Sequence, residues 1–241
     1  MTVIAVLLTF ASGASDVASF TRLGTVFTSV MTGNMTIFGL SLARGSAPLA
    51  EHTAVAVAGY VVGVAAGTRV MWHHAARNSH PDDKAPGGDA PGGEWPPHIT
   101  LTLLIEMVLF AGVVAGWELT GSRPAGAAQF GILVLAACAM GIQSAAVNEM
   151  GLGNVSTTYL TGTLTGLVSA IARPDKKPTG RRRPGVLLGL LAGAVLGGAF
   201  LATVPAVVPL LPLLAVAAVV VLGSGQVQLP GNQRGNGSVV R

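Results

Sequence analysis

Long apolar stretches constrain this chain more than any other feature. Apolar residues make up 51% of its 241 residues and charged residues only 10%, against about 25% charged in soluble domains. About 20 consecutive apolar residues cross a bilayer as one helix. The sequence predicts eight such helices, at about residues 3–20, 25–43, 53–72, 98–117, 128–148, 154–171, 185–203 and 206–223. We therefore expect an all-α integral membrane protein, folded as a polytopic helical bundle.

The number of spans stays open between seven and eight. Ser12, Ser15, Asp16 and Ser19 dilute the first stretch, and only a short link around Pro205 separates the last two. The number of spans decides how the two copies of an internal repeat are oriented relative to one another in the membrane. With eight spans the two copies run in the same direction, whereas they become inverted if one stretch does not cross.

The repeat is visible in two passages, LGTVFTSVMTGN at 23–34 and LGNVSTTYLTGT at 152–163, which share six of twelve positions. Three glycines spaced by four also recur 130 residues later. They are Gly59, Gly63 and Gly67, then Gly189, Gly193 and Gly197. Such spacing lets helix backbones approach closely. We expect one membrane domain, 1–223, built of repeats at about 3–117 and 128–223, with the glycines facing another helix or a second copy in a homodimer.

The basic residues predict the orientation. Six Lys or Arg lie within 173–183, and with eight spans ten lie on the side of both termini against four opposite. Excess positive charge marks cytoplasmic loops. This places both termini in the cytoplasm and the protein in a membrane, in contact with the lipid bilayer. The same basic loop also suits anionic headgroups, while its location argues against a nucleic-acid partner.

Two segments lie outside the predicted spans. Residues 73–97 are rich in proline, glycine and charge, and we expect them to form a flexible loop. Residues 224–241 form a polar tail that we expect to be disordered.

A stripe of polar residues follows the repeat. Helical spacing places Thr25, Thr28, Ser29, Thr32 and Thr36 on one face. Their counterparts 129 residues later are Asn154, Thr157, Thr158, Thr161 and Thr165, while Asn34 matches Thr163. Such a surface lines a pathway for a solute or ion, with Gly33 and Gly162 allowing close approach of a ligand. Alternatively, the hydroxyl groups serve only as hydrogen bonds between helices.

Three polar residues fall within other predicted spans. Asp16 lies in the first and Glu106 near the middle of the fourth, and a charge is costly in hydrocarbon. A carboxyl group held neutral by burial suits a proton- or cation-coupled step. For Asp16 the alternative is a helix cap, because Ser12–Ser15 could interrupt the helix. Gln143 lies in the fifth span, near the position that matches Asp16, and joins the predicted pathway.

The sequence contains no signature of an enzyme, a metal site or a cofactor. It has no phosphate-binding loop, zinc-protease motif, nucleophile elbow or dinucleotide fingerprint. Its one cysteine, Cys138, makes no disulfide framework. We expect no catalytic residue, no metal and no cofactor.

Several short motifs resemble a known family. They are Gly13-Ala-Ser-Asp16, Leu23-Gly24, Phe27, Met31-Thr-Gly-Asn34, Glu106, Gly141-Ile-Gln143, Thr157-Thr158 and Leu160-Thr-Gly-Thr163. Together they resemble the YoaK-like bacterial membrane proteins, known as domain of unknown function 1275. The resemblance covers roughly 3–222 and implies a polytopic inner-membrane protein without naming a substrate. Asn148-Glu149 departs from the pattern, because such proteins often carry basic residues there.

These observations favour a transporter of a small solute or ion. Its site would lie at the repeat interface, lined by Thr32–Asn34 and Thr161–Thr163, and Asp16 and Glu106 would be its ionisable groups. Alternating access about the glycine strips would move the substrate. The alternative is a membrane scaffold or sensor whose polar stripes serve packing alone.

Overall fold

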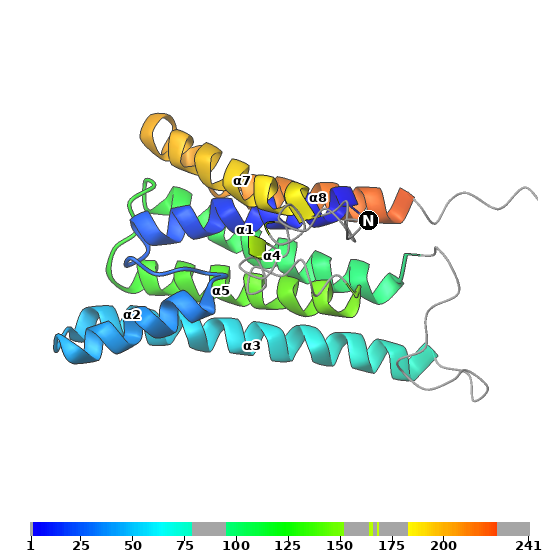
Figure 1. Cartoon of the computed structure of the whole chain (residues 1–241), viewed down its shortest axis with the longest axis horizontal. Helices are drawn as coiled ribbons and strands as arrows, with labels where there is room; N and C mark the ends of the chain where they lie inside the picture. Colours follow the sequence, from blue (N-terminus) through cyan, green and yellow to red (C-terminus); the bar gives the residue numbers. More distant parts are fainter. Residues whose placement is uncertain (1, 79–94, 152–163, 166–167, 169–182, 226–241) are drawn as a thin grey trace, which may run out of the picture.

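The computed structural model describes residues 2–78, 95–151, 164–165, 168 and 183–225, and over these the chain is helical and without strands. The elements are α1 (Thr2–Arg22), α2 (Met31–Ala43), α3 (Ala47–Asn78), α4 (Pro97–Leu119), α5 (Gly126–Glu149), α7 (Arg183–Thr203), the short η3 (Pro205–Val207) and α8 (Leu210–Gly225). Figure 1 shows the long helices lying side by side as one bundle. The all-helical membrane class predicted from the apolar stretches is confirmed.

Six of the described helices are long and apolar enough to cross a membrane, namely α1, α3, α4, α5, α7 and η3–α8 taken together. They match six of the eight predicted spans. Helix α2 is not among them, because its 13 residues rise only about 20 Å against a hydrocarbon core of about 30 Å. The predicted span at 154–171 lies almost wholly outside the described residues.

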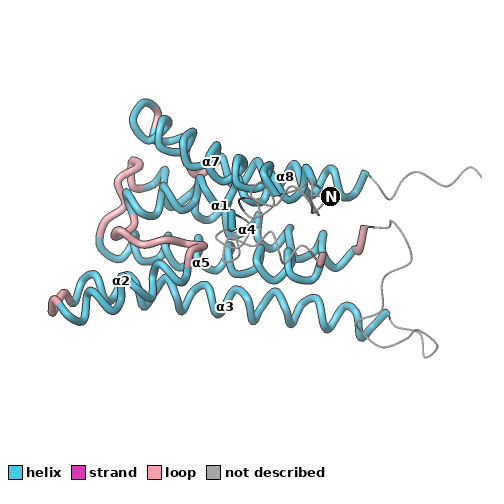
Figure 2. The backbone as a smooth tube through the Cα atoms, viewed as in Figure 1, coloured by secondary structure: helices cyan, strands magenta, loops and turns pink. Residues whose placement is uncertain are grey.

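The predicted helix at 25–43 is wrong in its first part. Residues 23–30 form turns and extended chain, and the helix begins at Met31. In Figures 1 and 2 this segment leaves α1, runs back along the bundle, and is followed by α2, which returns to the same end to meet α3. Residues 23–46 therefore enter the bundle and leave it again at the same end. The helical periodicity of the sequence was misleading here. Side chains from outside the segment bond its backbone N–H and C=O groups, in place of the hydrogen bonds that a helix would form within itself.

Two of the predicted boundaries also change. Helix α3 continues to Asn78, so the first six residues of the expected loop 73–97 are helical, and 79–94 lie outside the described residues. Helix α8 ends at Gly225, and 226–241 likewise lie outside.

The long helices form two parallel pairs joined by close glycine contacts. A methyl group added at Gly13 of α1 would overlap the carbonyl oxygen of Leu190 in α7, and one at Gly193 would overlap that of Phe10. In the other pair, a methyl group at Gly63 of α3 would overlap the carbonyl oxygen of Cys138, and one at Gly141 of α5 that of Tyr60. Backbone thus packs directly on backbone in both pairs.

The remaining long helices complete the bundle. Helix α4 runs antiparallel to α5, since Gly112 lies against Leu135 and Gly116 against Ile132. The indole Nε1 of Trp117 at the end of α4 donates to the carbonyl oxygen of Pro205 at 2.9 Å, which fixes η3 and the start of α8. In Figure 1, α1 begins and α8 ends at one end of the bundle, here called the terminal end.

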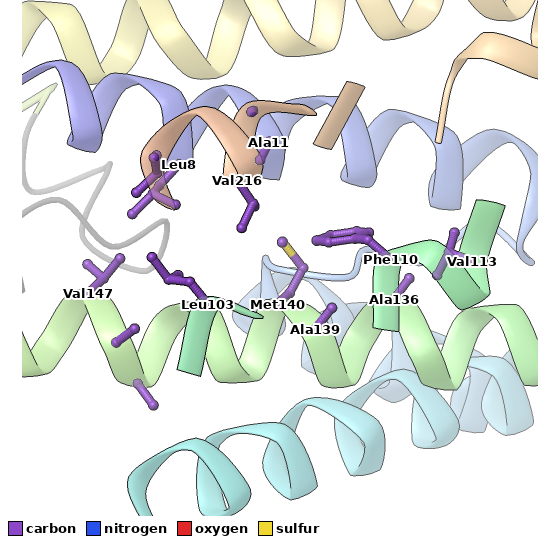
Figure 3. Packing of buried hydrophobic residues seen from close by; sticks show 14 of the residues in the cluster. Leu8, Ala11, Leu103, Phe110, Val113, Ala136, Ala139, Met140, Val147 and Val216 are labelled. Carbon is purple, nitrogen blue, oxygen red and sulfur yellow. The ribbon is translucent and has the colours of Figure 1, made fainter. Parts of the chain in front are cut away.

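The core lies where α1, α4, α5 and α8 meet. Figure 3 shows Leu8 and Val216 facing Leu103, Phe110 and Met140 across this junction. All five are 1% exposed or less. The buried face of α4 repeats every three or four residues, at Ile99, Thr102, Leu103, Glu106, Phe110, Val113 and Trp117. Glu106 is the one ionisable member of that face, so the fold places a carboxyl group among apolar neighbours.

Candidate functional site

Asp16 holds the non-helical segment in place. Its Oδ1 accepts the backbone N–H groups of Thr28 and Ser29, both at 2.8 Å, and the Thr28 hydroxyl at 3.0 Å. Its Oδ2 accepts the Ser29 hydroxyl at 2.5 Å. Ser15 and Thr28 are hydrogen-bonded through their hydroxyl groups at 3.0 Å. The Thr28 proton goes to Asp16, so the Ser15 hydroxyl is the donor.

Asn34 holds the same segment from the other side. Its Oδ1 accepts the N–H of Phe27 at 2.8 Å, and its Nδ2 donates to the Phe27 carbonyl oxygen at 2.7 Å. The side-chain amide of Asn34 therefore pairs with both backbone groups of Phe27, as the backbone of a neighbouring β-strand would. Asn34 is fully buried. Non-helical backbone is tolerated at membrane depth only where protein or an aqueous cavity satisfies its polar groups, and Asp16 and Asn34 supply those partners.

The turn after α1 needs an unusual backbone. Gly24 has φ +96° and Thr25 φ +61°, so both occupy the left-handed region. The Gly24 α-carbon lies against the ring of His52, and a methyl group there would overlap it. His52 Nε2 lies 3.1 Å from Oε1 of Gln129, whose Nε2 donates to the Arg22 carbonyl oxygen at 2.8 Å. This network ties the end of α1 to α3 and α5.

The polar stripe predicted along 25–36 does not form one face. Thr28 and Ser29 are buried in the non-helical segment, whereas Thr32 and Thr36 are exposed on α2. Gly33 is half-buried beside Phe27 and Val30. The structure brings Asp16, Thr28 and Asn34 together and leaves Thr32 apart. The second copy, Thr157, Thr161, Gly162 and Thr163, lies outside the described residues.

A cavity of about 330 Å³ opens beside Asp16. It lies between α1, α7 and the non-helical segment, and Gly13, Asp16, Phe20, Phe27, Val30 and Leu190 line it. Most of these side chains are apolar. The Asp16 oxygens have four hydrogen-bond donors among Thr28 and Ser29, so this cavity favours apolar contents over an ion.

Glu106 is the most unusual group in the bundle. It is 0% exposed, and neither of its carboxyl oxygens has a hydrogen-bond partner among the residues that the structure describes. It lies ten residues into α4, about the middle of a 23-residue helix. Unpaired charges at such a place are costly, and intramembrane ionisable residues are functional candidates for that reason.

Gln143 supplies a second polar group to the core. Its Nε2 donates to the Leu8 carbonyl oxygen at 3.1 Å and to Ser12 Oγ at 3.0 Å, while its Oε1 has no partner. Ser12 in turn donates to the Leu8 carbonyl oxygen at 3.1 Å. Sequence reasoning noted Ser12 and Ser15 only as residues that dilute the first span or interrupt its helix. Both bond a predicted site residue, and their position on one face of α1 with Asp16 was the available signal.

No group of three or more histidine, cysteine, aspartate or glutamate side chains is placed to hold a metal ion in the part of the chain that the structure describes.

The four predicted site residues in the bundle that are buried and polar, other than Thr28, are of two kinds. One set, at Asp16 and Asn34, is satisfied by the backbone of 27–29. The other, at Glu106 and Gln143, retains unpaired oxygen atoms in the core.

Comparison with known proteins agrees with this architecture. A family model described as "Protein of unknown function (DUF1275)" matches residues 4–222. The chain is also similar to the UPF0700 transmembrane protein YoaK of Bacillus subtilis (strain 168), with 28% identity over 167 residues. That alignment covers 69% of this chain and 65% of the relative, so it spans somewhat less than two thirds of the relative's length. No solved structure matches the chain.

The family model covers nearly the whole bundle, including Asp16, Asn34, Glu106 and Gln143, and the resemblance predicted from the short motifs is confirmed. The chain belongs to the DUF1275 family of transmembrane proteins, whose function is not established.

Proposed function

We propose that this protein transports a small solute or an ion across the bacterial inner membrane. The observation that carries the proposal is Glu106, a fully buried carboxyl group without a hydrogen-bond partner midway along a candidate membrane span. A structural role would provide such a group with donors, as Asp16 has. A group that binds and releases a cation or proton needs free oxygens instead.

The pairing of the helices fits an inverted two-fold relationship between the proposed repeats, and this supports the proposal. Gly13 and Gly141 are 128 residues apart, and their partners in the parallel pairs, Gly193 and Gly63, are 130 apart. Helix α1 thus packs on α7 as α5 packs on α3. In Figure 1, α1 and α5 run in opposite directions. Inverted repeats of this kind are common in secondary transporters.

The pairing suggests how the bundle would move. Close backbone contacts make α1–α7 and α3–α5 into two stiff units, each joining helices from both repeats. Rocking of one unit against the other would open the junction at Glu106 first toward one side and then toward the other. Residues 23–30, fixed to α1 by Asp16 and continuous with α2, would travel with these units.

We also propose that the terminal end of the bundle faces the cytoplasm. Among the described cations, only Arg22, Arg44 and Arg123 lie at the opposite end. Most of the other Lys and Arg residues fall, in sequence, between or beyond helix ends at the terminal end. The positive-inside rule then gives cytoplasmic termini.

Access of water to the core tests the proposal without a known substrate. In a Cys138→Ala background, Met140→Cys and Leu103→Cys place thiols beside Glu106. Leu119→Cys at the opposite end and His73→Cys at the terminal end serve as controls. A membrane-impermeant methanethiosulfonate reagent is applied from each side of oriented vesicles. We expect labelling of at least one core thiol, and each control should react from one side only.

A scaffold or sensor remains the competing function, and the satisfied groups at Asp16 and Asn34 favour it. If both controls react and neither core thiol does from either side, the core is closed to water. The transport proposal would then be wrong, and the polar groups would serve packing alone.

A further inference from the structure

Four buried side-chain oxygen atoms lack a hydrogen-bond partner in the part of the chain that the structure describes. One is Ser19 Oγ near the end of α1, and the other three belong to two neighbouring helices. They are Oε1 and Oε2 of Glu106 on α4 and Oε1 of Gln143 on α5. Both side chains are buried, with 0% and 5% exposure. All three atoms are acceptors unless a proton is added, so they would repel one another if brought together as they stand.

The contacts between α4 and α5 place both residues at the same depth. An added methyl carbon at Gly112 would lie 3.2 Å from Leu135 Cδ1, and one at Gly116 would lie 2.9 Å from Ile132 Cγ1. The helices are antiparallel and rise equally per residue. Glu106 is therefore level with about residues 141–142 of α5, within one turn of Gln143.

The faces of the helices agree with this register. Gln143 follows Ile132 by eleven residues, so the two share a face of α5, and Ile132 contacts α4. Glu106 lies between Leu103 and Phe110 on α4. Figure 3 shows these two apolar side chains pointing into the junction where Met140 and Leu8 also meet. Both polar residues thus belong to the junction of α1, α4 and α5.

The orientation of the Gln143 amide is fixed by its partners. The Leu8 carbonyl oxygen can only accept, and the Ser12 hydroxyl already donates to that same carbonyl. The Gln143 nitrogen must therefore face α1, where it donates to both groups. Its carbonyl oxygen is left over as an acceptor within the core.

We propose that Glu106 and Gln143 form a proton-binding site, in which the protonated Glu106 carboxyl donates its O–H to Gln143 Oε1. One proton then satisfies two of the three unpaired oxygens. Release leaves the Glu106 carboxylate and a proton in water on the open side, and binding reverses that step. The inference deepens the proposed function, on which it rests for its physiological role, by naming the proton as the ligand of the central site.

A proton fits this junction better than a metal cation. Hard cations such as Ca²⁺ and Mg²⁺ take six or more oxygen ligands, whereas the junction offers few, among Leu8, Leu103, Phe110 and Met140. Groups on the packed helices do not provide a charge partner at this depth. On α5 these groups are Cys138 and Glu149, and on α1 they are Asp16 and Arg22. Helix α8 has none, and α3 carries Glu51, His52, Tyr60, Arg69, His73, His74 and Arg77.

Infrared spectroscopy tests the site directly, with purified full-length protein in lipid at neutral pH. A protonated carboxyl group has a C=O stretching band separate from the amide bands, and the band shifts when D₂O replaces H₂O. We expect one such band that Glu106→Gln abolishes and Glu118→Gln, at the exposed end of α4, leaves unchanged. Gln143→Leu should shift the band to higher frequency, because the hydrogen-bond acceptor is lost.

The outcomes separate this inference from transport. Absence of the band, or its persistence in Glu106→Gln, would overturn the proton site. Loss of the band on adding NaCl at constant pH and ionic strength would also overturn it, in favour of a sodium site. A Glu106 band in a protein whose core thiols stay unlabelled would support the proton site and reject transport. If Gln143→Leu does not fold, Glu106→Gln alone decides, since it preserves the size of the side chain.

Discussion

Asp16 and Ser29 are joined by two hydrogen bonds, from the Ser29 N–H to Oδ1 at 2.8 Å and from its hydroxyl to Oδ2 at 2.5 Å. The two residues are 13 positions apart in the sequence, and the chain reverses its direction between them. The same carboxyl group also accepts both donors of Thr28. Asp16 thus supplies the acceptor oxygens that the backbone carbonyl groups of the preceding turn would supply if this segment were a helix.

Removal of the Asp16 carboxyl group should destabilise the fold. Asp16→Ala removes the acceptor of the buried Thr28 and Ser29 N–H groups, and a lost buried hydrogen bond of this kind costs about 1–3 kcal/mol. Asp16→Asn keeps one carbonyl oxygen for these N–H groups and should lose less. Thermal unfolding in detergent measures the difference, with Thr36→Ala on the exposed face of α2 as the control. Equal stability of Asp16→Ala and Thr36→Ala would contradict this role.

Even a substitution that preserves the shape of the Asn34 side chain should lower the stability of the fold. In Asn34→Asp, one oxygen still accepts from the Phe27 N–H, but the other now faces the Phe27 carbonyl oxygen, to which Nδ2 donated at 2.7 Å. The loss of that bond and the buried acceptor pair should cost about 1–3 kcal/mol at neutral pH. Unfolding of the variant across a pH series measures this. Protonation of the new carboxyl group restores a donor, so the defect should shrink as the pH falls.

The glycine contacts predict which methyl groups the bundle tolerates. Gly63→Ala and Gly193→Ala should each cost about 1–3 kcal/mol, because backbone occupies the space that the methyl group needs. Gly131→Ala on α5 is the matched control, since nothing lies within 4 Å of its added carbon. That change should stabilise the helix by about 0.5–1 kcal/mol. A destabilising Gly131→Ala, or a neutral Gly63→Ala, would show that the helices are not packed in this way.

Glu106 should be dispensable for folding. Its carboxyl oxygens make no hydrogen bond, and replacing a buried polar group without partners by an apolar one is often neutral or stabilising. We expect Glu106→Gln to melt at the same temperature as the parent or higher, because its amide also supplies a donor for Gln143 Oε1, and Glu106→Leu, which supplies none, to melt below Glu106→Gln. Proton flux into proteoliposomes under an imposed potential should fall in both variants. A marked loss of stability in Glu106→Gln would instead indicate a structural partner for the carboxyl group.

The amino-acid sequence by itself determined the membrane class, the six long helices and the glycine strips, since each depends on local composition or spacing. It also identified Asp16, Asn34 and Glu106, because polar groups are conspicuous in apolar stretches. Tertiary structure decided what those groups do. The segment 23–30 has helical periodicity, yet Asp16 from α1 and Asn34 from α2 replace its helical hydrogen bonds, and periodicity cannot reveal partners from other elements.

Tertiary structure likewise decided the direction of the helices. Whether 25–43 crosses the membrane changes the direction of every later span, and the apolar character of that stretch is the same in either case. The length left to α2 after the non-helical segment, 13 residues, is what keeps it from crossing. Glycine spacing showed which faces are flat, but the pairing of α1 with α7 and α3 with α5 appears only when the backbones meet, because close contact depends on both partners.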